Sequence, residues 1–129
     1  MARKVMRLFV FVLALSCATL AFAGPAKETA KAPMVPVIGM VTVVEFGAEY
    51  CPPCRLMKPI LQNAQREYRG RAAVVTVDVT RYQSLATRLD VRVIPTLVFY
   101  DAMGQELARH EGYLDKRDLY AQLDKMLAK

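Results

Sequence analysis

Two cysteines lie three positions apart in the segment Cys51-Pro52-Pro53-Cys54, after a short apolar run and before a stretch with helical periodicity. A disulfide between them would close a very short loop, and the loop-entropy relation gives such a crosslink only roughly 2 kcal/mol. Their closeness fits an exchange reaction better, because one thiolate can attack a disulfide and the second can resolve the mixed disulfide. The pair therefore predicts a redox-active dithiol at a junction between a strand and a helix.

Residues 1–23 have the three parts of a secretory signal peptide. The basic residues, the apolar run and the small-residue cleavage site are Arg3, Lys4 and Arg7, then 8–20, then Ala21-Phe22-Ala23. The apolar run is shorter than the roughly 20 residues that a membrane-spanning helix needs. We therefore expect cleavage after Ala23 and export to the periplasm, with a retained membrane anchor as the alternative.

The predicted signal peptide changes how the composition is interpreted. The third cysteine, Cys17, falls inside it, so the mature chain would keep a single cysteine pair. About 106 residues would remain, which is enough for one domain and too few for two. The formal net charge of +6 includes three cations of the signal peptide, and the rest of the chain has no basic cluster. We therefore expect no binding to nucleic acid, and we separately expect a monomer.

A zinc half-site is another interpretation of the two cysteines. A structural zinc ion needs four ligands, and the mature chain offers only His110 besides the pair. We therefore expect no metal and no bound cofactor, with the disulfide itself as the redox group.

Alternating strand and helix patterns predict an α/β fold. Residues 24–40 contain three prolines and are interpreted as a proline-rich arm, followed by one domain over 41–129. The expected elements are a strand over 41–46, a helix over 53–68, a strand over 73–79, a short helix from 80 or 82 to 89, strands over 96–100 and 105–111, and a last helix capped by Asp115. A helix between the first two strands implies parallel pairing, so we expect a central mixed sheet of about four strands flanked by helices.

The helix after the cysteines has apolar residues at nearly every fourth position. These residues are Leu56, Ile60, Ala64 and Tyr68, with Leu61 beside them. Such a stripe is expected to face the core.

The chain resembles the thioredoxin family over about 41–129, most of the mature sequence. The residues that carry the resemblance are Glu45-Phe46-Gly47-Ala48-Glu49-Tyr50-Cys51-Pro52-Pro53-Cys54, Pro59, Val93-Ile94-Pro95-Thr96, Gly104 and Gly112. The resemblance implies a thioredoxin-like sandwich, thiol-disulfide exchange through a Cys51–Cys54 disulfide, and protein thiols and disulfides as substrates. Gly47 and Tyr50 stand where the family usually has tryptophans.

The two cysteines are expected to have different roles. Cys51 would lie just before the helix, where free N–H groups and the helix dipole favour a thiolate, so it should be the exposed nucleophile. Cys54, one turn further on, should be the buried resolving thiol. Pro52 and Pro53 have no N–H to donate to the thiolate, which favours a more reducing couple.

Three further positions are candidate site residues. Glu45 is the only charged residue in the first apolar run, so burial would raise its pKa and it could exchange a proton with Cys54, unless it faces solvent at an edge. The resemblance implies that Pro95 forms a cis peptide bond facing the active pair and that the backbone of Ile94 contacts an extended substrate. Tyr50 is either an aromatic contact beside Cys51 or a core residue.

These features predict an exported thiol-disulfide oxidoreductase that resembles the small thioredoxin-like proteins of envelope thiol pathways. We expect it to be a reductant of envelope protein disulfides or apocytochromes c, recharged by a membrane electron relay of the DsbD or CcdA kind. The alternatives are a disulfide oxidase or isomerase, and a non-catalytic module that uses the same scaffold to bind a partner.

Overall fold

The structure, a computed structural model, describes residues 31–128. Its elements, in chain order, are β1 (Val41–Gly47), α2 (Pro52–Glu67), β2 (Ala72–Asp78), α3 (Gln83–Arg88), β3 (Thr96–Tyr100), β4 (Glu106–Glu111) and α4 (Lys116–Leu127). The four strands form one sheet in the order β2-β1-β3-β4. The predicted α/β sandwich with a mixed sheet is confirmed, and the element boundaries lie within a few residues of the predicted ones.

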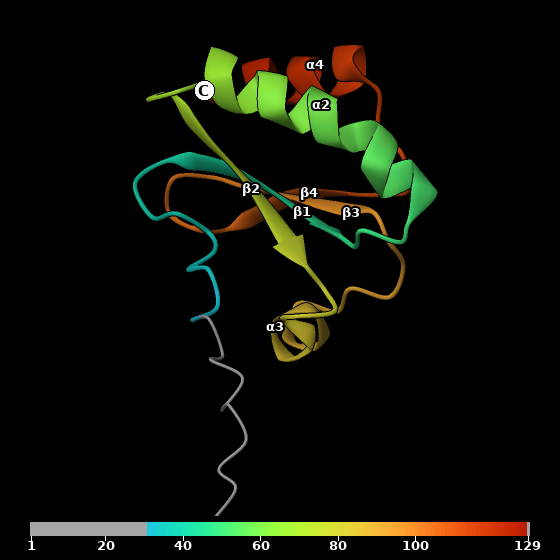
Figure 1. The fold of residues 1–129 in the computed structure, drawn as a ribbon. Coiled ribbons are helices and arrows are strands. Elements are labelled where there is room, and N and C mark those ends of the chain that lie inside the picture. Colours follow the sequence, from blue (N-terminus) through green and yellow to red (C-terminus); the bar gives the residue numbers. More distant parts are fainter. Residues whose placement is uncertain (1–30, 129) are drawn as a thin grey trace, which may run out of the picture. The chain divides into compact units, whose positions relative to one another are not determined.

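The sheet is built around β1. This strand pairs in parallel with β2 and antiparallel with β3, and β3 and β4 form a hairpin. Figure 1 shows α2 and α4 together on one face of the sheet and α3 on the other. Because β1 is covered on both faces, every residue from 42 to 47 is buried, which explains its nearly continuous apolar sequence.

Two apolar clusters fill the spaces between the sheet and the helices. The cluster under α2 and α4 includes Val43, Leu97, Phe99, Leu119 and Leu123. The cluster on the side of α3 includes Val44, Phe46, Val77, Leu85 and Val98. Neighbouring residues of β1 thus belong to opposite clusters, as expected for a strand whose side chains alternate between faces.

One end of each of the two long helices has a local cause in the sequence. Asp115 caps α4 as predicted, because its carboxylate accepts a hydrogen bond from the Asp118 N–H at 2.9 Å. After α2, Gly70 has a φ of +80°, a conformation that glycine adopts at little cost, and the chain turns there into β2.

The predicted inner face of α2 is wrong at one position. Leu56 is 65% exposed, whereas the neighbouring Met57 is fully buried. The buried residues of the helix are Cys54, Met57, Leu61 and Ala64. Steps of three and four residues keep this set on one side of a helix with 3.6 residues per turn, and the strict spacing of four that includes Leu56 drifts away from it.

The final residues of the segment predicted as an arm contact the domain. The Gly39 N–H donates to the Ala102 carbonyl at 2.7 Å, and the Val37 N–H donates to Thr42 Oγ1 at 3.2 Å. Val35 packs against the cluster beneath α3. The part of the arm after Met34 is therefore ordered against the domain, and residues 24–30 lie outside the described residues.

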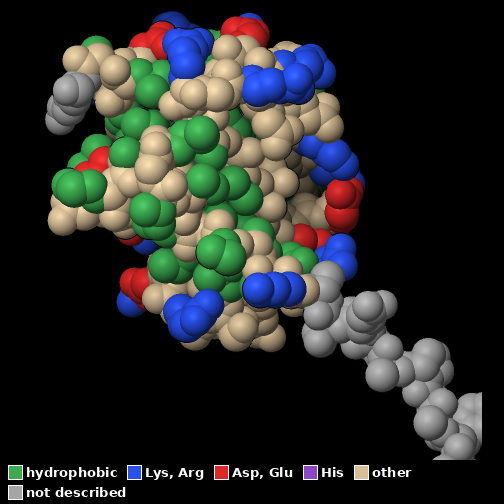
Figure 2. Space-filling view, turned by 90° about the vertical axis from the view of Figure 1, so that its left-hand side faces the viewer, with side chains coloured by type: hydrophobic (Ala, Val, Ile, Leu, Met, Phe, Trp, Pro, Cys, Tyr) green, Lys and Arg blue, Asp and Glu red, His purple; other side chains and the backbone are tan. Residues whose placement is uncertain are grey.

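One surface of the domain carries apolar side chains in its middle, with lysine, arginine and acidic side chains toward its rim, as Figure 2 shows. Among the exposed apolar residues of the chain are Met34, Ile38 and Met103, each at least 71% exposed. Within residues 31–128, no helix is long and apolar enough to cross a membrane.

The contrast between Met57 and Leu56 gives a stability prediction. Met57→Ala should lower the free energy of unfolding by about 2 to 5 kcal/mol, because it removes a fully buried side chain and leaves a cavity. Leu56→Ala, one residue away in the same helix, is the matched control and should change it by about 0.5 kcal/mol or less. Urea unfolding of both oxidised variants measures the difference. Similar losses in the two variants would contradict the assigned helix face.

Candidate active site

The dithiol lies where β1 leads into α2. Cys51 is the N-cap of the helix, and Pro52 and Pro53 occupy the first helical positions, where an N–H would have no partner within the helix. The Cys54 N–H donates to Cys51 Sγ at 3.4 Å. The two cysteines form a disulfide, with their Cα atoms 5.3 Å apart.

The predicted difference in exposure between the cysteines is wrong for the disulfide form. Cys51 is 6% exposed and Cys54 is 7% exposed. Both pack with Ala48, and Val79 and Ile94 lie against them. These contacts cover Cys51 in the disulfide form, whereas the prediction considered Cys51 as a free thiolate.

The loop before β3 approaches the disulfide from the other side. The Ile94–Pro95 peptide bond is cis, as the resemblance implied. The carbonyl oxygen of Ile94 lies 3.9 Å from Cys51 Sγ. The Pro95 carbonyl accepts a hydrogen bond from the Gly112 N–H at 2.7 Å, which ties this loop to the end of β4. Residues distant in the sequence therefore meet at the sulfur of Cys51.

Tyr50 lies on the surface beside the disulfide. Its side chain is 69% exposed, so the alternative that Tyr50 is a core residue is wrong. It lines a groove of about 430 Å³ together with Val93, Ile94 and residues of α3. An exposed aromatic ring next to a groove and a reactive disulfide is well placed to contact a protein substrate. Contact of Tyr50 and Ile94 with substrate stays a prediction.

Glu45 is buried on the side of the sheet that faces α2. Alternate residues of a strand share a face, so Glu45 lies on the same side as Val43, which packs in the cluster beneath α2. Glu45 is only 5% exposed, and this burial raises the pKa of its carboxyl to about 7. A solvated glutamate at the sheet edge, the alternative interpretation, is therefore wrong.

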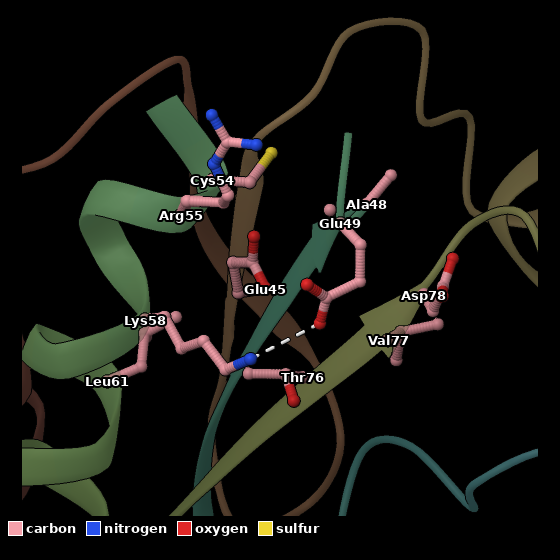
Figure 3. Close-up of a pocket in the computed structure, with 11 residues that line it drawn as sticks. Glu45, Ala48, Glu49, Cys54, Arg55, Lys58, Leu61, Thr76, Val77 and Asp78 are labelled. Carbon is pink, nitrogen blue, oxygen red and sulfur yellow. Dashed lines mark hydrogen bonds and ion pairs between the residues drawn. The ribbon is translucent and has the colours of Figure 1, made fainter. Parts of the chain in front are cut away.

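Glu45 and Cys54 line the same pocket, which has a volume of about 120 Å³ and is shown in Figure 3. An acid that titrates near neutral pH can both accept and release a proton under working conditions. The arrangement suits proton exchange with Cys54, although this role of Glu45 stays a prediction.

Several residues of this pocket were not found from the sequence. Thr76 and Asp78 line it and carry no motif, and Gly47, although it lies in the segment that carries the resemblance, was not predicted as a site residue. The register of the parallel pair brings them there, because Glu45 pairs with Thr76 and Gly47 pairs with Asp78. These residues could have been found from the sequence by aligning the two predicted strands as a parallel pair in this register.

Charged side chains also lie beside the pocket. Lys58 Nζ and Glu49 Oε1 are 3.2 Å apart, and both side chains are more than half exposed, so the pair contributes little to stability. His110 lies on β4, where its ring nitrogen contacts the Tyr113 carbonyl at 3.1 Å, and it has no place in the site. Within residues 31–128, no group of three or more His, Cys, Asp or Glu side chains could hold a metal ion.

Comparison with known proteins agrees with the geometry. The family model described as Thioredoxin matches residues 36–125. The chain belongs to the thioredoxin family. It is 34% identical to thioredoxins of several Staphylococcus aureus strains over 87 residues, which is 67% of this chain and 83% of theirs.

Solved structures show the same likeness. A chloroplastic thioredoxin z has a TM-score of 0.63 and 30% identity, covering 70% of this chain and 81% of its own. A malarial protein has a TM-score of 0.63 and 28% identity, covering 68% of this chain and 98% of its own. With family membership and the cysteine pair in place, the protein is a thiol-disulfide oxidoreductase. Thioredoxin-family proteins act on protein thiols and disulfides, and they use the disulfide itself in place of a bound cofactor.

The position of each cysteine predicts different effects of their removal. With dithiothreitol as electron source, Cys51→Ser should abolish reduction of insulin disulfides, because only Cys51 lies at the helix start where it can begin the exchange. Cys54→Ser should instead accumulate a mixed disulfide, since the resolving thiol is missing. Insulin turbidity and mass spectrometry under non-reducing conditions measure the two outcomes. Equal activity in both variants would contradict the assigned order of attack.

The burial of Glu45 predicts a pH-dependent stability. Its raised pKa means that the folded protein holds a proton that the unfolded chain has lost, so this stabilisation is fully present below about 4.5 and disappears as the pH rises through about 7. The change amounts to about 3 kcal/mol. Glu45→Gln cannot titrate, so its free energy of unfolding should lack this decrease and should exceed that of the unmodified protein at about pH 8.

Urea unfolding of the oxidised protein across this pH range provides the measurement. Glu49→Gln is the matched control, because the Glu49 side chain is 79% exposed and its replacement should keep the decrease. A decrease that persists in Glu45→Gln would show that another group causes it.

Proposed function

We propose that the protein is an exported reductant that delivers electrons to disulfides of envelope proteins, apocytochromes c among them. The observation that carries the proposal is the environment of Cys51 Sγ. In the part of the chain that the structure describes, the only N–H that donates to this sulfur is that of Cys54, at 3.4 Å. Pro52 and Pro53, which lie between, have no N–H.

The Ile94 carbonyl adds to this effect. Its oxygen lies 3.9 Å from Cys51 Sγ, where it can accept a hydrogen bond from the thiol but cannot donate one to the thiolate. A hydrogen bond to the neutral form disfavours the charged form. With one donor and a nearby acceptor, the reduced state is stabilised less, and a less stabilised reduced state makes the couple a stronger reductant.

The sequence supports the cellular side of the proposal. Residues 1–23 have the pattern of a cleaved signal peptide, and they lie outside the described residues. In the oxidising periplasm a dithiol remains reduced only if it receives electrons. A membrane electron relay of the DsbD or CcdA kind would supply them by exchange with the Cys51–Cys54 disulfide.

The reduction potential of the Cys51–Cys54 couple tests the proposal. We expect a value closer to the about −270 mV of thioredoxin than to the about −120 mV of DsbA. Equilibration with glutathione or with a thioredoxin of known potential, followed by alkylation and mass spectrometry, gives the value. A potential above about −150 mV would favour a disulfide oxidase or isomerase, and a disulfide that dithiothreitol leaves closed would favour a binding module.

A further inference from the structure

Gly47 lies where any side chain would displace the carboxyl group of Glu45. A Cβ atom built on it would overlap Glu45 Oε1 and lie 3.2 Å from Cys54 Cβ. The φ of Gly47 is outside the left-handed region, so its backbone conformation does not require glycine. Space between the acid and the resolving cysteine is therefore the physical reason for glycine at this position.

The missing side chain leaves a pocket that reaches the buried acid. The pocket has a volume of about 120 Å³ and is open to solvent on one side. A single water molecule needs about 10 to 15 Å³ of such space, so the pocket has room for several. Figure 3 shows the carboxylates of Glu45 and Glu49 and the side chain of Thr76 around this space. These polar groups, set among apolar ones such as Leu61 and Val77, give water molecules hydrogen-bonding partners.

We propose that Gly47 is a positioning residue that keeps this pocket open, so that water in the pocket carries the proton between Glu45 and solvent while Cys54 resolves the mixed disulfide. The inference rests on the assigned exchange chemistry of Cys51 and Cys54. Burial raises the pKa of Glu45 to about 7, and no charged or hydrogen-bonding partner among residues 31–128 contributes to this shift. Water is therefore the natural exchange partner of this carboxyl.

Glu45 carboxylate takes the proton from the Cys54 thiol, and the resulting thiolate attacks Cys51 Sγ. The Cys51–Cys54 bond forms, the bond between Cys51 and the substrate sulfur breaks, and the electron pair leaves on the substrate thiolate, which takes a proton from solvent. The proton on Glu45 then leaves through the water of the pocket, and the carboxylate is restored.

The groups that face Glu45 across the pocket come from three parts of the chain. The titratable and charged ones are Cys54, Arg55 and Lys58 of α2, Glu49 of the preceding loop, and Asp78 of β2. From β3 the residue paired with Glu45 is the uncharged Leu97. Lys58 is paired with Glu49, and Asp78 accepts hydrogen bonds from Thr80 at 2.6 and 2.8 Å. Removal of water from the pocket would therefore leave the Glu45 carboxylate less solvated and raise its pKa further.

Gly47→Ala tests the proposal through the kinetics of the resolving step. Stopped-flow measurement with a model aromatic disulfide should show this step slowed by about tenfold, part of the 10² to 10⁴ that general acid-base catalysis contributes. Its pH midpoint should move upward. The initial attack by Cys51, measured in a Cys54→Ser background, should be unchanged and serves as the internal control.

A double-mutant cycle separates proton transfer from packing. In a Glu45→Gln background, Gly47→Ala should change the resolving rate by less than about twofold, because the group through which Gly47 acts is gone. An equal slowing in both backgrounds would show a purely structural effect and overturn the proposal. An unchanged rate and midpoint in Gly47→Ala alone would overturn it as well.

A measurement on the unmodified oxidised protein covers the case in which Gly47→Ala does not fold. At about pH 5 the carboxyl stretch of protonated Glu45, assigned by its loss in Glu45→Gln, should shift within the mixing time when the protein enters D₂O. Persistence of the unshifted band for seconds would overturn the proposal, since it would show that solvent does not reach the acid. Failure of the proposed reductant role would appear instead in the reduction potential, which these experiments do not use.

Discussion

The position of Cys51 as the N-cap of α2 is the constraint on which the site depends. It places the sulfur at the positive end of the helix, within 3.4 Å of the Cys54 N–H. It also sets Cys54 one turn further on, close enough for a disulfide. The loop before β3 completes the arrangement by bringing the Ile94 carbonyl to 3.9 Å from the same sulfur. The balance between one donor and one acceptor at this atom underlies the proposed reducing character.

The alternation of side chains along β1 adds the second half of the chemistry. It directs Val44 and Phe46 toward α3 and leaves Glu45 under α2 beside Cys54. A carboxyl in this place costs stability above neutral pH, because burial opposes its ionisation. Proteins often keep such unfavourable groups where they serve chemistry. In the proposed mechanism Gly47, two residues later, leaves room for water next to the carboxyl, and this water reduces the loss of stability that its ionisation causes.

Much of the fold and of the cysteine pair could be predicted from local patterns. The apolar run of β1, the Cys-Pro-Pro-Cys segment and the Asp115 cap each depend on neighbours in the sequence, and each was placed within a residue or two. The predicted burial of Leu56 was wrong, because a strict spacing of four residues does not match the period of a helix. The pocket that Thr76 and Asp78 line depends on the register between two strands, and the burial of Cys51 depends on packing with Val79 and Ile94, which are distant in the sequence. Such non-local facts required the three-dimensional structure.

The relative reactivity of the two thiols tests the central claim most directly. The reduced protein would be treated with a limiting amount of iodoacetamide at about pH 7, and the modified cysteine identified by peptide mapping. The account predicts that Cys51 is alkylated well before Cys54, because the start of α2 favours its thiolate and Cys54 lies one turn inside the helix. Equal modification of the two cysteines, or faster modification of Cys54, would contradict it.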